Sequence, residues 1–170
     1  MTKALMQVTA LFILFAGPAA AQVPVFVNGS IGGSYDIDDR DPLTGGGFAY
    51  LVGVGLRFRQ LAVGAEFGQQ SLGGGRKAKQ YGAVARFSAG SSGPVRPYFV
   101  VGVSDYRYSP AANGNRSAVG GSVGPGVAFA LASWRVSALL EARFHSSFDR
   151  IAAVSSQEFL SVMVGLQLGL

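Results

Sequence analysis

The sequence of 170 residues has no cysteine, and only 14% of its residues carry a charge. The absence of cysteine excludes disulfides and thiolate metal sites as the source of its stability. The sequence also lacks an uninterrupted apolar run of the ~20 residues that a membrane-spanning helix needs. Yet 49% of the residues are hydrophobic and 25 are glycine, so the chain must cover its apolar surface in another way.

Residues 1–21 have the pattern of a cleaved secretory signal. Lys3 precedes an apolar centre at residues 11–15, a helix-breaking Gly17-Pro18 follows, and three alanines stand before Gln22. This A-x-A arrangement predicts cleavage after Ala21. An uncleaved anchor is the alternative, but its apolar run would fall short of ~20 residues. We therefore expect one exported domain over residues 22–170.

The hairpin pattern at residues 47–68 indicates the fold class. Alternate residues form two different faces, and a period of two is typical of β-strands. The second face holds glycine, alanine and the charged residues Arg57, Arg59 and Glu66. Small residues with a few charges are typical of a narrow barrel interior beneath a lipid-facing exterior. The first face is wholly apolar in its first strand: Phe48, Tyr50, Val52, Val54, Leu56 and Phe58.

The same alternation recurs along the chain and predicts an all-β fold, an eight-stranded antiparallel up-and-down transmembrane β-barrel. Short turns of such barrels face the periplasm and longer loops face outward, so we expect both termini in the periplasm. A soluble lipocalin-type barrel is an alternative that would require the apolar face to point inward. We expect strands at residues 23–35, 47–59, 61–68, 80–89, 97–104, 117–131, 134–145 and 159–170, with long loops at 36–46, 71–79, 109–116 and 146–156.

The charged residues of the strands fall on the face opposite the apolar one. An arginine on the lipid side at mid-bilayer would cost ~2–4 kcal/mol, so this placement favours the barrel. An eight-stranded barrel is just wide enough for its side chains to fill it, and unpaired buried charge is costly. We expect a linked ion-pair network that plugs the lumen, with a narrow gated pore as the alternative. Its predicted members are Arg57, Arg59, Glu66, Arg86, Glu141 and Arg143.

Four residues fit the alternation less well. Asp105, Arg107 and Glu158 fall on the lipid face, so each must lie above the apolar band or follow a bulge. Pro125 lies inside a strand and cannot donate a ladder hydrogen bond. We expect a β-bulge at Pro125.

Three stretches give the chain a resemblance to the small OmpA/OmpX-type outer-membrane barrels. They are RPYFVVGVS at residues 96–104, LLEARF at 139–144 and the closing FLSVMVGLQLGL. The resemblance implies a non-enzymatic protein of the outer membrane of a Gram-negative-type bacterium, with a structural or surface-interaction role. It also implies contact with the barrel-assembly machinery, which reads a terminal aromatic residue in most relatives. This chain ends in Leu170 instead.

His145, Ser147 and Glu158 offer an enzymatic alternative. They are similar to the His-x-Ser…Glu set of the PagL-type lipid A deacylases, in which a hydroxyl nucleophile works beside an oriented base. Two features depart from that family. His145 shares the lumen face with Glu141, whereas the family's site faces lipid, and Phe148 stands where the family has asparagine. We therefore assign no catalytic residue, and Ser147 with its two companions remains the alternative site.

Basic and acidic loop residues suggest the partners. Arg76, Lys77 and Lys79 could hold lipopolysaccharide phosphates electrostatically. The balance of 14 Lys and Arg against 9 Asp and Glu favours anionic headgroups over nucleic acid for an exported protein. The acidic residues 36–41 lack the glycine and glutamate of a calcium-binding loop, so we expect neither a metal nor a cofactor. We expect a monomer whose loops could also contact a surface ligand.

Overall fold

The computed structural model describes residues 24–38, 41–72, 75–90, 93–109, 116–131, 135–148 and 158–170. The predicted signal at residues 1–21 lies outside these residues. No helix long enough and apolar enough to cross a membrane occurs in the described part of the chain. The strands are β1 (Val25–Asp38), β2 (Asp41–Phe58), β3 (Leu61–Ser71), β4 (Lys77–Ser88), β5 (Val95–Ser109), β6 (Arg116–Ala130), β7 (Val136–Ser147) and β8 (Glu158–Gly169).

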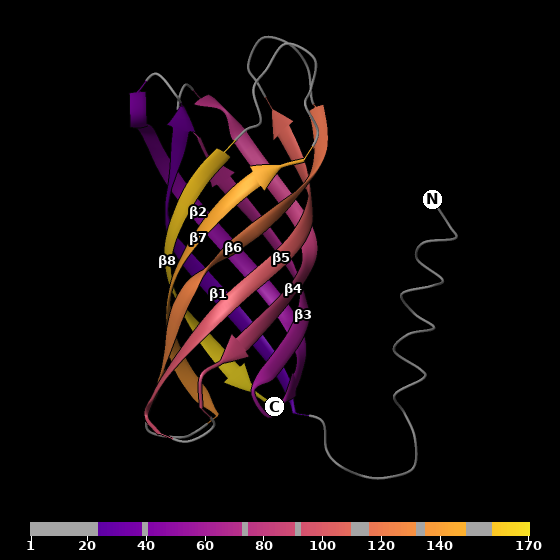
Figure 1. The fold of residues 1–170 in the computed structure, drawn as a ribbon, viewed down its shortest axis with the longest axis vertical. Coiled ribbons are helices and arrows are strands. Elements are labelled where there is room, and N and C mark those ends of the chain that lie inside the picture. The colour runs from indigo at the N-terminus through magenta and orange to yellow at the C-terminus, as the bar shows by residue number, and fades with distance from the viewer. Residues whose placement is uncertain are drawn as a thin grey trace, which may run out of the picture.

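The eight strands form a closed barrel in which each strand pairs with its neighbours in the chain (Figure 1). All pairs are antiparallel, and β8 closes on β1 from Phe26↔Gly169 to Ile37↔Glu158. The fold prediction is therefore confirmed. We call the end at which β1 begins and β8 ends the terminal end, and the opposite end the distal end.

Side chains alternate between the barrel interior and its outer wall. On β5, Val101 and Val103 are 42% and 54% exposed, whereas Ser104 is 6% exposed. The outer wall carries large apolar side chains on every strand, and the interior holds most of the buried polar and charged groups. This arrangement excludes the lipocalin-type alternative, which needed the opposite assignment of the two faces.

Glycine on the inner face lets neighbouring strands approach closely. A Cβ atom at Gly124 would overlap the carbonyl oxygen of Ala142 on β7, and a Cβ at Gly126 would overlap the ring of Tyr98. Gly29 on the outer wall differs, because a Cβ there would meet no atom within 4 Å. The inner glycines therefore make room for backbone and for the larger lumen side chains.

The predicted bulge at Pro125 is wrong. Pro125 keeps its place opposite Phe99 on β5, and the register between β6 and β7 is the same at Val123↔Phe144 and at Gly126↔Glu141. The β6–β7 ladder is interrupted at Gly124 and Pro125 alone, because proline has no N–H to donate. An irregularity occurs instead between Tyr35 and Ile37, where the β1–β2 register shifts.

The predicted loop at residues 36–46 is also wrong, because most of it belongs to the β1–β2 hairpin. Pairing continues through Tyr35↔Gly46 and Ile37↔Pro42 to Asp38↔Asp41. The prediction relied on the polar composition of this stretch. Beyond the apolar band, however, a strand needs only its backbone hydrogen bonds, so polar residues do not end it.

Candidate functional site

Four buried charged residues meet in the middle of the lumen. Arg143 on β7 donates from Nη1 and Nη2 to the two carboxylate oxygens of Glu66 on β3, at 2.6 and 3.1 Å. Its Nε also donates to Glu141 Oε1. Arg86 on β4 donates from Nη2 to Glu66 Oε1 at 2.5 Å, and its Nε lies 3.5 Å from Glu141 Oε2. Each arginine therefore contacts both carboxylates.

This cluster, which we call the ionic network, is shielded from solvent. Arg143 is 1% exposed, and Glu66, Arg86 and Glu141 are each 5–6% exposed. Moving such charges out of water is expensive, and the cost is offset only when the pairing geometry is good and further hydrogen bonds are made. Tyr98 supplies one of these by donating its hydroxyl to Glu141 Oε2 at 2.8 Å.

Two of the six predicted members, Arg57 and Arg59, are not in the ionic network. Arg59 lies in the β2–β3 turn with a positive φ of 52°, and its side chain is exposed. Arg57 is half-buried and lines a hollow at the terminal end of the barrel. Neither forms an ion pair with a carboxylate among the described residues. Arg57 lies on the inner face opposite Ala62, near the terminal end, whereas Arg59 lies beyond the last residue of β2.

Tyr98 and Arg96 are interior residues that the predicted network did not include. Both precede Gly102 on β5 by an even number of positions, so alternation assigns them to the lumen face. Tyr98 is 7% exposed and hydrogen-bonded to Glu141. Arg96 donates from Nη2 to Ser137 Oγ at 3.0 Å. Alternation from Gly102 places Tyr98 on the lumen face, and its extension by one further step places Arg96 there as well.

The residues of the enzymatic alternative do not assemble into a catalytic site. His145 is fully buried in the lumen, where its Nδ1 lies 3.0 Å from the Tyr106 hydroxyl and its Nε2 lies 2.9 Å from Ser161 Oγ. Ser147 points into the same interior and is 5% exposed. Glu158 is opposite Ser146, which lies between the inward-facing His145 and Ser147, so Glu158 belongs to the outer wall. Both nitrogens of His145 therefore contact hydroxyls other than that of Ser147, and the carboxylate is on the other face.

The three basic residues predicted to contact lipopolysaccharide, Arg76, Lys77 and Lys79, do not lie together in one loop. Arg76 forms an ion pair with the buried carboxylate of Asp36. Lys77 and Lys79 lie in β4, not in a loop, and both are exposed on the outer wall. Lys79 is opposite Arg107 on β5, whose guanidinium lies over the Tyr81 ring at 5.2 Å. The structure thus places Arg107 beside the two lysines.

Asp105 and Arg107 belong to the outer wall because β5 keeps one register with β4 and with β6 throughout. No bulge reorients them. Arg107 Nε donates to Asp105 Oδ2 at 3.2 Å in an exposed ion pair near the distal end. Among the described residues, no group of three or more His, Asp or Glu side chains is placed to hold a metal ion.

Comparison with solved structures identifies the architecture. Neisserial surface protein A superposes with a TM-score of 0.72 at 17% identity, covering 85% of this chain and 96% of that chain. Ail, the attachment invasion locus protein of Yersinia pestis, solved with the heparin analogue sucrose octasulfate, gives 0.56 at 14%, covering 87% and 99%. The outer membrane enzyme PagL gives 0.50 at 13%, covering 84% and 98%.

These identities are low, so the property shared is the fold. The chain has the fold of the small OmpA/OmpX-type outer-membrane barrels, as the sequence analysis predicted. No protein-family model and no curated protein sequence matches the chain.

Proposed function

We propose that the chain is a non-enzymatic barrel of a bacterial outer membrane that holds lipopolysaccharide at its distal rim. In this proposal the terminal end faces the periplasm and the ionic network plugs the lumen. The observation that carries it is a row of exposed basic side chains directly above an outward-facing aromatic residue.

The outer wall supports a membrane location. Its apolar surface surrounds the barrel, whereas soluble monomers rarely expose contiguous apolar patches of more than a few hundred Å². Exposed aromatic residues lie toward both ends of this wall, as in the interfacial girdles of outer-membrane barrels. Toward the distal end they are Tyr35, Phe48 and Tyr81, and toward the terminal end they are Phe58, Phe87, Phe99 and Phe129.

The basic strip consists of Lys77, Lys79 and Arg107. Lys79 and Arg107 face each other across the β4–β5 ladder, and Lys77 follows on the same face two residues toward the distal end. Tyr81 lies two residues toward the membrane from Lys79, and its ring packs under Arg107. Aromatic belts lie at headgroup level, so a basic group just above one is placed to meet lipid phosphates.

Asp105 partly offsets the positive charge of this strip. Its ion pair with Arg107 is exposed on both sides, and such pairs contribute about 0–1 kcal/mol. A lipopolysaccharide phosphate could therefore compete for Arg107. Ail, which has the same fold, was solved with a polysulfated ligand, and a polyanion is the class of ligand that this strip would attract.

Retention of lipopolysaccharide tests the proposal. The triple variant Lys77→Gln/Lys79→Gln/Arg107→Gln should copurify with less lipopolysaccharide than the parent chain and show a smaller rise in unfolding temperature when lipopolysaccharide is added. Arg135→Gln, which removes an exposed charge just before β7 at the terminal end, should behave as the parent does. Equal retention by the triple variant would overturn the proposal.

A narrow gated pore is the second candidate, because each arginine of the ionic network contacts both carboxylates and could exchange partners. Planar-bilayer recording separates the two proposals. A plugged lumen gives no discrete openings, whereas a gated pore gives steps that change size in Glu141→Gln. Discrete current steps from the parent chain would contradict the plugged lumen and support the gated pore.

A further inference from the structure

A hollow lined by arginines lies inside the terminal end of the barrel, on the opposite side of the ionic network from the distal end. The space outside the protein atoms there is about 470 Å³, a figure that includes open solvent, so the hollow is open and not enclosed. Four arginines from three parts of the chain line it: Arg57 and Arg59 at the end of β2 and its turn, Arg86 on β4, and Arg96 on β5. We call this space the arginine vestibule.

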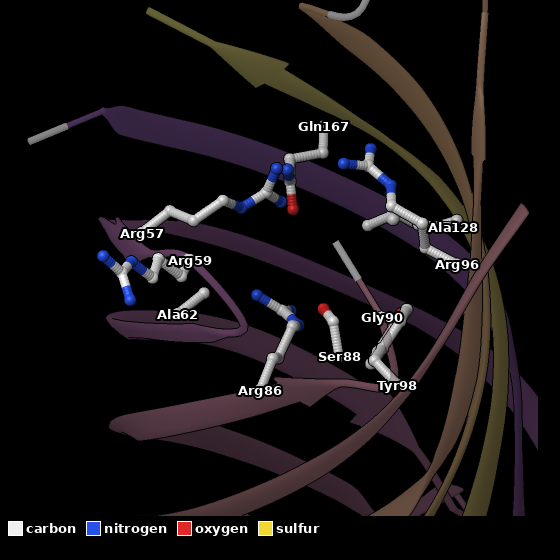
Figure 2. Close-up of a pocket in the computed structure, with 11 residues that line it drawn as sticks. Arg57, Arg59, Ala62, Arg86, Ser88, Gly90, Arg96, Tyr98, Ala128 and Gln167 are labelled. Carbon is white, nitrogen blue, oxygen red and sulfur yellow. The ribbon is translucent and has the colours of Figure 1, made fainter. Parts of the chain in front are cut away.

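The guanidinium groups of Arg57, Arg86 and Arg96 extend into the arginine vestibule. Figure 2 shows Arg57 and Arg96 extending toward each other from opposite sides, with Arg86 entering from a third direction. Arg59 lies at the edge, and its guanidinium points away from the other three. The amide of Gln167 and the hydroxyl of Ser88 also face this space. Gln167 and Arg86 are 4% and 5% exposed, so part of the lining is deeply buried.

No carboxylate lines the arginine vestibule among the described residues. Glu66 and Glu141 lie instead in the ionic network, where they share their charge between Arg86 and Arg143. Two carboxylates are thus balanced by two arginines. Arg57 and Arg96 then remain without an ion-pair partner in the described part of the chain.

Several donors that belong to this lining lack acceptors. Arg86 uses Nη2 for Glu66, but its buried Nη1 and Nε have no hydrogen-bond partner, although Nε lies 3.5 Å from a Glu141 oxygen. The buried Nε of Arg96 also has none. An unsatisfied buried donor is costly, more so when it is charged. Converging cations with free donors are therefore placed to bind an anion.

We propose that the arginine vestibule binds a phosphate group. Guanidinium groups match phosphate oxygens through paired N–H donors, and arginine is favoured wherever such recognition matters. A carboxylate presents its two oxygens in one plane, whereas a phosphate presents oxygens in four directions. Donors that approach from three sides, with a hydroxyl and an amide beside them, fit the tetrahedral group. Free phosphate and a phosphorylated lipid headgroup share this chemistry.

Calorimetric titration with inorganic phosphate tests the site. The folded chain in a maltoside detergent, at constant ionic strength, should bind phosphate at one saturable site. Arg57→Gln and Arg96→Gln should each weaken binding, and the double variant by about tenfold or more, because each removes charge-assisted hydrogen bonds. Arg135→Gln removes one positive charge near the same end but outside the lining, and it should bind as the parent does.

Three results would overturn the proposal: no saturable binding by the parent, undiminished binding by the double variant, or equal weakening by Arg135→Gln. If the double variant does not fold, the parent chain and the two single variants decide. The unfolding temperature of the parent must respond to millimolar phosphate more strongly than that of Arg57→Gln or Arg96→Gln does, because the general kosmotropic effect of phosphate is the same for all three chains. Repeating the titration in phosphatidylcholine bilayers, with and without phosphatidylglycerol, identifies the source. Competition by the anionic lipid assigns the site to a headgroup, and its absence assigns it to free phosphate.

Discussion

Glu66 on β3 and Arg143 on β7 are joined by two hydrogen bonds across the lumen, although 77 positions separate them in the sequence. These strands are not neighbours in the barrel, so the contact links two walls that share no backbone ladder. Arg86 on β4 and Glu141 on β7 complete the link. The ionic network therefore braces the barrel internally.

Removing Arg143 should destabilise the barrel strongly. Arg143→Gln leaves Glu66 and Glu141 with Arg86 as their one arginine partner in the ionic network, and breaking a buried pair costs about 3–5 kcal/mol. Urea unfolding from lipid vesicles measures the loss of free energy of unfolding. Glu66→Gln/Arg143→Gln should cost less than the sum of the two single variants. Additivity within about 0.5 kcal/mol would show that the two residues are not coupled.

Tyr98→Phe should cost about 1.5–3 kcal/mol of unfolding free energy, because it removes a hydrogen bond to a charged group. The hydroxyl is buried and donates to Glu141 at 2.8 Å. Tyr35→Phe is the matched control, since that ring is 40% exposed on the outer wall. The same unfolding experiment compares them, and equal losses would contradict the role given to Tyr98.

Gly124→Ala should impair folding, whereas Gly29→Ala should not. The added methyl group at Gly124 meets the Ala142 carbonyl oxygen, which is backbone and cannot move aside cheaply. At Gly29 the methyl group enters open space on the outer wall, and replacing glycine there should stabilise by about 0.4–1 kcal/mol. The folded fraction on unheated gels distinguishes the two variants. A fully folded Gly124→Ala would refute the close approach.

Expression of the chain in a Gram-negative host should leave the acyl chains of lipid A unchanged. The structure surrounds His145 with the hydroxyls of Tyr106 and Ser161 and puts Glu158 on the other face. Mass spectrometry of extracted lipid A measures the outcome. If the parent chain removes one acyl chain and Ser147→Ala does not, the protein is a deacylase instead.

Alternation in the sequence predicted the fold and the face of nearly every charged strand residue, because inside and outside differ by a single step along a strand. It did not predict height along the barrel. Arg59 has the correct parity for the lumen, but it sits in a turn and is exposed. Height depends on how strands are staggered, and that is a property of pairing across the whole barrel.

Partners were harder to predict than faces. Asp36 pairs with Arg76 and Tyr106 contacts His145, and each pair joins segments 39 or 40 positions apart. Local sequence patterns do not encode such contacts, which explains why Arg76 was grouped with the lysines. The extension of the β1–β2 hairpin was missed for another reason. Polar residues indicate the end of a strand only within the apolar band, and this hairpin continues beyond that band.

The pairing of β1 with β8 has a consequence for biogenesis. Phe26 and Gly169 become neighbours only after all eight strands have been synthesised. Until then both margins of the growing sheet carry unpaired backbone groups, which are templates for aggregation with other chains. The newly synthesised chain must therefore be kept from pairing its β1 edge with other proteins until β8 is available to close the barrel.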